Sequence, residues 1–235
     1  MNFVLKHASP EYVWNRILHV HGQYHKTLKH FGYNYTRFIP DDARIREMFE
    51  KEHLTTEQEK YYHDILVNEI YDKNDLNKFD DVILNQVIPL MQRGVEKLKP
   101  MLKSWNATLP DTVQIVCDYG RGGSYRYEAP YGITFRCTGF RGNHFGMAGL
   151  FIHEFVHILI EKPIIEKYQV PQDLKERIVD IICLEFFNRP VQKSFENSFA
   201  NAYITRDAIE HDLPGAVAKM MADFTKLQRQ QQAEK

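Results

Sequence analysis

A short segment in the second half of the chain carries residue types that can bind a metal ion and move a proton. His153 and His157 are four positions apart, and Glu154 directly follows the first histidine. If the segment is helical, a pitch of 3.6 residues places both imidazoles on one face, about one turn apart. Two neutral imidazoles so placed can bind one zinc ion, which takes three protein ligands and a water. Glu154 can then reach the metal-activated water as a general base.

The residues around this segment predict a buried helix. Residues 147–161 are largely apolar, and Pro163 ends the pattern. Burying two histidines and a glutamate on one face of a helix is unfavourable unless their polar atoms have hydrogen-bond partners or bind an ion. A metal ion would satisfy them, and the alternative is a pair of core histidines that bond to Glu154.

A third ligand is expected from a second helix, predicted over residues 173–187. This helix places Glu176 and Asp180 four positions apart on one face. Either carboxylate can complete a metal site with two imidazoles. The alternative is a solvated acidic face that balances Lys175 and Arg177.

Together the two helices resemble the gluzincin branch of the zincin metallopeptidases. In that branch a Glu-x-x-x-Asp helix follows His-Glu-x-x-His, and here Glu176 comes 176 − 157 = 19 positions after His157. The resemblance covers about thirty residues. It implies zinc-dependent hydrolysis of a peptide or protein, with one zinc ion per chain held by His153, His157 and Glu176. It also implies that Asp180 orients a ligand histidine, although Asp180 as third ligand stays an alternative.

Peptide hydrolysis also needs a group that stabilises the oxyanion. Weak candidates for this role are Tyr168, Tyr203 and His211. In zincins, an edge strand before the metal helix binds extended substrate by backbone pairing. By this resemblance the strand is expected at residues 131–137, and a plain core strand is the alternative. The predicted substrate-binding residues are Tyr131, Gly132, Ile133, Thr134 and Phe135.

The predicted fold is α+β and zincin-like. Residues 1–108 form a mainly helical N-terminal region, because apolar residues recur three and four positions apart; Thr55 followed by Gln58 is typical of a helix start. Residues 109–235 form a zincin-like catalytic region with a helical C-terminal part. The two regions are either separate or one compact domain.

Within the catalytic region a small antiparallel sheet is expected to pack on the active-site helix. Glycines at 120–123 indicate a hairpin turn. Short β-branched and aromatic runs indicate the strands, at 112–117, 125–127 and 131–137.

Composition excludes few classes of function. The 235 residues carry a formal net charge of −1, so no charge pattern indicates a nucleic acid or an anionic membrane as partner. Three scattered cysteines suggest no disulfide framework, and neither a signal peptide nor a membrane span is predicted. A cytoplasmic location is therefore expected, with a secreted enzyme lacking its signal as the alternative. The oligomeric state stays open.

Two other classes of function stay open. Glu154 and His157 also fit the Glu-x-x-His motif of di-iron carboxylate proteins, and Glu50 with His53 forms a second copy, which would make an oxidase or an iron-binding protein. Strands predicted between the two copies argue against that four-helix arrangement. The other class is a non-catalytic binding module with a zincin fold. The intact Glu154 argues against it, because a structural zinc needs no base.

Overall fold

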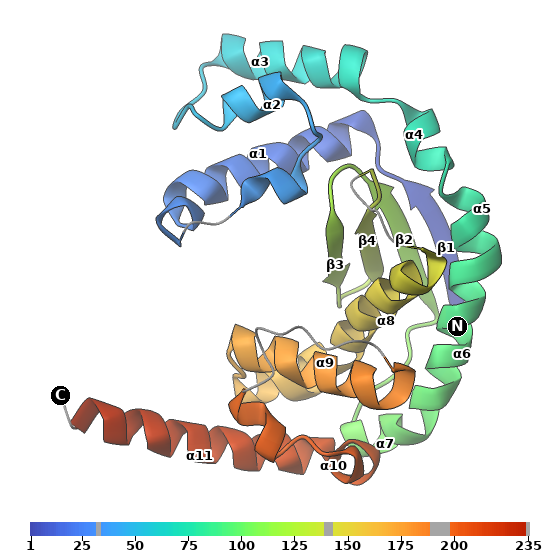
Figure 1. The fold of residues 1–235 in the computed structure, drawn as a ribbon, viewed down its shortest axis with the longest axis vertical. Helices are drawn as coiled ribbons and strands as arrows, with labels where there is room; N and C mark the ends of the chain where they lie inside the picture. The colour runs from blue at the N-terminus through green and yellow to red at the C-terminus, as the bar shows by residue number, and fades with distance from the viewer. Residues whose placement is uncertain (32–33, 139–142, 189–197, 234–235) are drawn as a thin grey trace.

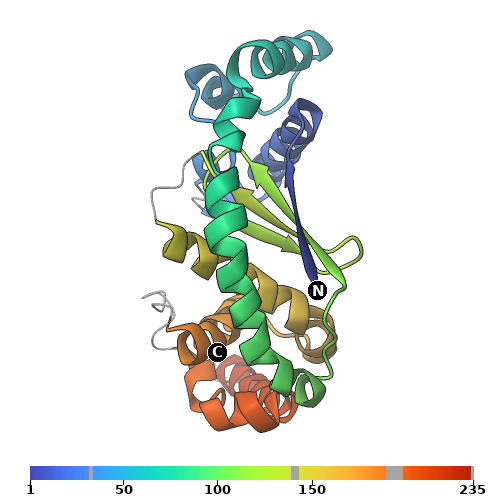
Figure 2. The ribbon, with the colours of Figure 1, turned by 90° about the vertical axis from the view of Figure 1, so that its right-hand side faces the viewer.

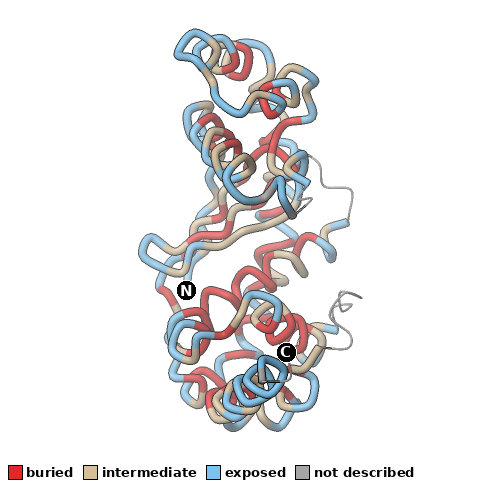
Figure 3. The backbone as a smooth tube through the Cα atoms, turned by 90° about the vertical axis from the view of Figure 1, so that its left-hand side faces the viewer, coloured by how far each residue is buried: buried red, intermediate tan, exposed pale blue. Residues whose placement is uncertain are grey.

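The computed structural model describes residues 1–31, 34–138, 143–188 and 198–233. These residues form an α+β fold in which a small mixed sheet is flanked by helices (Figure 1). Buried segments concentrate in the sheet and in the helices packed beside it (Figure 3). His153, Glu154, His157 and Asp180 are among these buried residues.

The sheet combines the first strand of the chain with three strands from its middle. The strands are β1 (Asn2–His7), β2 (Thr112–Asp118), β3 (Gly122–Arg126) and β4 (Gly132–Arg136), in the order β1-β2-β4-β3. Strands β1, β2 and β4 are parallel, and β3 is antiparallel to β4. The prediction of an antiparallel sheet is therefore wrong for β2 and β4. The chain reverses direction between β2 and β3 and again between β3 and β4, so β4 runs in the same direction as β2.

Strand β1 adds to the sheet a segment that the helical interpretation of residues 1–108 does not include. It pairs in register with β2, with Asn2 opposite Thr112. Alternate residues of β1 are half-buried, as expected for a strand that packs on one face only. The sheet therefore contains residues from both halves of the chain.

Strand β4 lies in the interior of the sheet, so the prediction of an edge strand at residues 131–137 is wrong. Gly132 pairs with Gln114 of β2 on one side and with Arg126 of β3 on the other. Of the predicted substrate-binding residues, Gly132 to Phe135 thus lie in a core strand that is paired on both sides, and Tyr131 directly precedes it. The strand at this end of the sheet is β3.

The N-terminal half is otherwise helical, as predicted. Its first group of helices precedes residue 72 and comprises α1 (Pro10–Lys26), η1 (Leu28–Phe31), η2 (Tyr35–Phe38), α2 (Ala43–Met48), α3 (Thr56–Ile65) and η3 (Leu66–Ile70). The second group comprises α4 (Lys73–Asn77), α5 (Asp80–Val82), η4 (Ile83–Val87), α6 (Ile88–Leu98), η5 (Lys99–Met101) and α7 (Leu102–Trp105). The run from α5 to α7 forms a long rod beside the sheet (Figure 2), and η4 and α6 pack on the helix that carries the histidine pair.

That helix, α8 (His144–Ile160), is the centre of the fold. Asn143 caps its start by accepting a hydrogen bond from the Gly146 N–H at 3.0 Å. The helix packs on β3, β4, α6 and α9. Phe151 meets Phe135 of β4 edge to face, with ring centroids 5.2 Å apart. Such contacts hold the helix against the sheet in a fixed register.

The chain after α8 is helical. It comprises η6 (Glu161–Glu166), α9 (Gln172–Phe187), η8 (Phe199–Ala202), α10 (Arg206–His211) and α11 (Leu213–Ala233). Pro163 lies within η6, a π-helical segment that continues α8, so the regular helix ends shortly before this proline. Among the described helices, none has the length and apolar character needed to span a membrane.

Candidate metal centre

The two predicted histidine ligands meet inside the protein. His153 and His157 lie one turn apart on α8, and their Nε2 atoms are 3.2 Å apart. Glu176 reaches them from α9. Its Oε2 is 3.3 Å from Nε2 of His153, and its Oε1 is 3.5 Å from Nε2 of His157. The three residues form a group that could hold a metal ion.

The separations within this group suit a small divalent cation. Ligand bonds of about 2.0–2.1 Å at tetrahedral angles place neighbouring donor atoms about 3.3 Å apart. The two imidazole nitrogens are 3.2 Å apart, close to that value. The two oxygens of Glu176 lie 3.3 Å from one nitrogen and 3.5 Å from the other, and with one donor atom per residue the three donors lie within 4.8 Å of one another. The donor set also suits other first-row divalent ions, so the geometry alone does not select zinc.

Asp180 lies behind the first histidine. Its Oδ1 is 3.2 Å from Nδ1 of His153, and its side chain is buried. Because Nδ1 and Nε2 lie on opposite sides of the imidazole ring, Asp180 directs Nε2 toward His157 and Glu176. This placement suits the orienting role predicted for Asp180, and it favours Glu176 as the third ligand.

Burial and mutual contacts set the charges of the group when no metal is bound. Burial lowers the pKa of His153, but contacts with Asp180, Cys183 and Glu176 outweigh it and raise that pKa to about 11. Burial and the charge of His153 together lower the pKa of His157. Burial also raises the pKa of Glu176, yet its contacts with the two imidazoles outweigh this and hold it below the usual value. A positive charge between these groups is therefore favoured, and a metal ion can replace the proton on His153.

Glu154 faces the edge strand of the sheet. Its carboxylate packs against Gly123 of β3 so closely that a Cβ at Gly123 would lie 2.5 Å from Oε1 of Glu154. The side chain of Glu154 is buried. The glycines at 120–123 indicate a turn in the sequence, but Gly123 lies within a strand and gives the predicted base its space.

Tyr125 lies two residues further along β3 and contacts the metal group. The sequence alone does not point to this residue. Its ring stacks flat on His157, with centroids 4.4 Å apart and planes inclined by 3°. Its hydroxyl donates to Oε2 of Glu161 at 2.7 Å and accepts from Nζ of Lys175 at 3.0 Å. The available signal is the two-residue period of a strand, which places Gly123 and Tyr125 on one face. That signal becomes useful only once β3 is known to pack on α8.

The weak oxyanion candidates contact the C-terminal helices. Tyr168 lines a hollow with residues of α11, and the Tyr203 hydroxyl donates to Asp223 at 3.1 Å. His211 is mostly exposed on α10, where its Nδ1 lies 3.1 Å from the carboxylate of Asp207. These contacts give no support to an oxyanion role for Tyr168, Tyr203 or His211.

The second Glu-x-x-His copy does not form a metal site with the first. His53 lies between α2 and α3, and its side chain is 90% exposed. In the part of the chain that the structure describes, the group of His153, His157 and Glu176 is the one set of residues arranged to hold a metal ion. The structure therefore does not favour a di-iron site.

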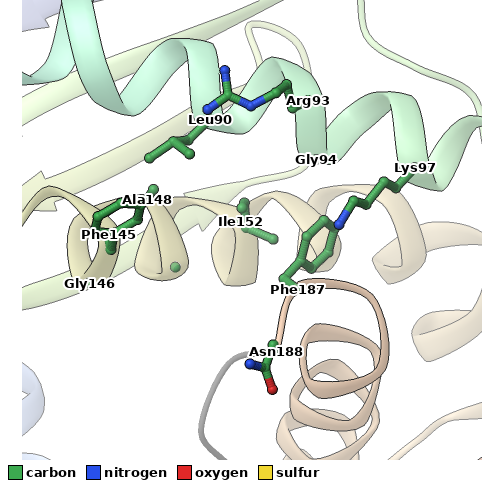
Figure 4. A pocket seen from close by; sticks show the side chains of 11 residues that line it. Leu90, Arg93, Gly94, Lys97, Phe145, Gly146, Ala148, Ile152, Phe187 and Asn188 are labelled. Atoms are coloured by element: carbon green, nitrogen blue, oxygen red, sulfur yellow. The ribbon is translucent and has the colours of Figure 1, made fainter.

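A separate cavity of about 840 Å³ lies between α6, α8 and the end of α9 (Figure 4). Phe145, Ile152 and Phe187 form much of its apolar wall, and Arg93 and Lys97 line it from α6. Ile152 precedes a metal-site histidine, but one residue of helix turns the side chain by about 100°. The cavity therefore lies on a different face of α8 from the metal group.

Comparison of the chain with protein-family models, with curated proteins and with solved structures gives no match. The function must therefore be argued from the site itself.

The geometry predicts unequal effects for the two acidic residues of α9. Glu176→Gln removes a ligand charge and should weaken zinc binding by at least about 100-fold. Asp180→Asn should weaken it by about 10-fold, because it acts through His153. Titration against a chromophoric chelator measures both, with the exposed Glu185→Gln on the same helix as control. A larger loss in Asp180→Asn than in Glu176→Gln would show that the third ligand is misassigned.

Proposed function

We propose that this protein is a zinc-dependent peptide hydrolase with a zincin-like arrangement of its site. The observation that carries the proposal is the convergence of His153, His157 and Glu176, whose donor atoms lie within 4.8 Å of one another. Glu154, which follows His153 on α8, adds a buried carboxylate that faces Gly123 of β3. Two imidazoles, a carboxylate ligand and an adjacent base form the set that metal-assisted hydrolysis requires.

When bound, zinc lowers the pKa of water and polarises a carbonyl group. The other catalytic tasks belong to residues of the chain. Glu154 accepts the proton of the attacking water and passes it to the leaving amine. Gly123 fixes the position of that carboxylate, and Asp180 keeps the first imidazole in the orientation needed for binding. Glu176 contributes negative charge to the ligand set.

The proposed substrate is a peptide or protein bound in extended form along β3. This strand ends the sheet next to β4, and it packs on α8. An extended peptide that pairs with β3 would add a strand to the sheet at this edge. Gly123 and Tyr125 contact Glu154 and His157, so such a peptide would pass beside the metal ligands. This assignment replaces the one made to residues 131–135.

Glu154→Gln tests the general base. The amide cannot accept a proton, so the rate of hydrolysis should fall at least about 100-fold while zinc affinity stays near that of the wild type. Cleavage of a mixed peptide library is followed by mass spectrometry, with zinc content measured on the same samples and Glu185→Gln as control. Peptidase activity that survives in Glu154→Gln, or a zinc-loaded wild type that cleaves no peptide, would overturn the proposal.

Gly123→Ala tests the space that β3 leaves for the base. The added methyl group would lie 2.5 Å from Oε1 of Glu154, so the flexible carboxylate must move. We expect a loss of activity of about 10-fold or more with zinc binding retained, because displacement of a catalytic group by 1 Å can cost about 100-fold in rate. Gly22→Ala is the matched control, since nothing lies within 4 Å of a Cβ there. Equal activity of the two variants would contradict the assigned position of Glu154.

A further inference from the structure

Three side chains beside the metal group form a connected cluster, which we call the brace: Tyr125, Glu161 and Lys175. The Tyr125 hydroxyl donates to Glu161 at 2.7 Å and accepts from Lys175 at 3.0 Å. Lys175 Nζ also lies 3.4 Å from Oε1 of Glu161, which closes the cluster. Each of the three polar groups therefore contacts both of the others.

The brace joins the three elements that build the site. Tyr125 comes from β3, Glu161 follows His157 by one helical turn, and Lys175 directly precedes Glu176 on α9. A displacement of any one element would break at least one contact of the brace. The cluster thus couples the positions of the edge strand, the histidine helix and the helix of the third ligand.

The charged members of the brace are largely buried. Glu161 is 7% exposed, and the Lys175 side chain is 12% exposed. A buried ion pair loses much of its Coulomb energy to desolvation, so it is weak evidence for a stabilising role. Burial and the neighbouring Glu161 raise the pKa of Tyr125 above its ordinary value. The hydroxyl therefore stays protonated and continues to donate to Glu161.

The two imidazoles of the metal group are held in different ways. Nδ1 of His153 faces the Asp180 carboxylate at 3.2 Å. The Nδ1 atoms of both histidines are buried, and neither makes a hydrogen bond among the described residues, so Asp180 acts on His153 through its nearby charge. Among the same residues, no ion pair through Nδ1 is found for His157. A ligand histidine is usually oriented through this second nitrogen. His157 is held at Nε2 by its contacts with His153 and Glu176, and the flat stack on Tyr125 is the contact that supports the plane of its ring.

We propose that Tyr125, held by Glu161 and Lys175, is a positioning residue that orients His157 for metal binding by ring stacking. The proposal rests on the metal site of the proposed function and assigns a role to a residue outside the ligand set. An imidazole that binds a cation is electron-poor, so the face of a phenol ring attracts it. The stack therefore becomes stronger when the metal is bound, and its loss should weaken metal affinity.

The test compares zinc affinity and Co²⁺ spectra among variants of the full chain. Tyr125→Leu removes the stack and should weaken zinc binding about 10-fold, with a shift in the visible d–d bands of the Co²⁺-loaded protein. Tyr125→Phe keeps the stacked ring but loses both hydroxyl contacts of the brace, so it should weaken zinc binding less, by about threefold. Chelator competition gives the affinities, and circular dichroism shows that each variant is folded. If Tyr125→Leu does not fold, Tyr125→Met takes its place, because its unbranched side chain adapts to irregular space.

Tyr127 provides a matched control just beyond the end of β3. Its hydroxyl donates to Glu166 at 2.7 Å, which is the same kind of bond that Tyr125 makes to Glu161. Tyr127→Leu should leave zinc affinity and the Co²⁺ spectrum unchanged. Wild-type affinity and an unchanged spectrum in folded Tyr125→Leu would overturn the positioning role alone, as would an equal loss in Tyr127→Leu. A wild-type protein that binds no zinc would overturn the proposed function and this inference with it.

Discussion

The close approach of three polar side chains between α8 and α9 is the constraint on which the site depends. Two imidazole nitrogens lie 3.2 Å apart beside a carboxylate, in surroundings largely closed to water. Burial of such groups is unfavourable unless a proton or a cation lies among them. The apolar packing of α8 on the sheet and on α6 holds the helix in place despite this cost. The same packing keeps the donor atoms at separations that suit a metal ion.

The residues of this group could be predicted from the sequence because the information is local. The spacing of His153 and His157 places both on one face of a single helix, and the spacing of Glu176 and Asp180 does the same on the next. Helix starts are equally local. Thr55 and Gln58 form the predicted capping box at the start of α3, with each side chain bonded to the backbone of the other residue.

The topology of the sheet could not be predicted in the same way. Its register joins residues more than a hundred positions apart, such as His7 and Cys117, and no local pattern specifies that pairing. Hydrophobic runs indicate that β2 and β4 are strands, but they do not indicate their relative direction or which strand lies at the edge. The contacts of Gly123 and Tyr125 with α8 follow from that topology. They therefore became visible only in three dimensions.

A side chain of the neighbouring strand β4 also holds the edge strand β3 in place. Arg136 of β4 donates to the Gly123 carbonyl and to the Ser124 hydroxyl, each at 3.1 Å, and its guanidinium lies 4.7 Å from the ring centre of Phe38. Burial and the nearby charge of Arg16 lower the pKa of Arg136, and the carboxylates of Asp118 and Glu154 partly oppose this shift. The position of β3 thus depends on a cation shared between the strand and a segment of the N-terminal half.

This dependence bears on how the chain is organised. Strand β1 pairs with β2 along its whole length, and η4 and α6 cover part of α8. Arg16 of α1 reaches the buried carboxylate of Asp118 at the end of β2, with Nη2 3.1 Å from Oδ1. Residues before 109 therefore provide a strand, a helical cover and a buried countercharge to the region that holds the metal group. The helical N-terminal half is part of the scaffold of the site, because the sheet on which α8 packs includes a strand from that half.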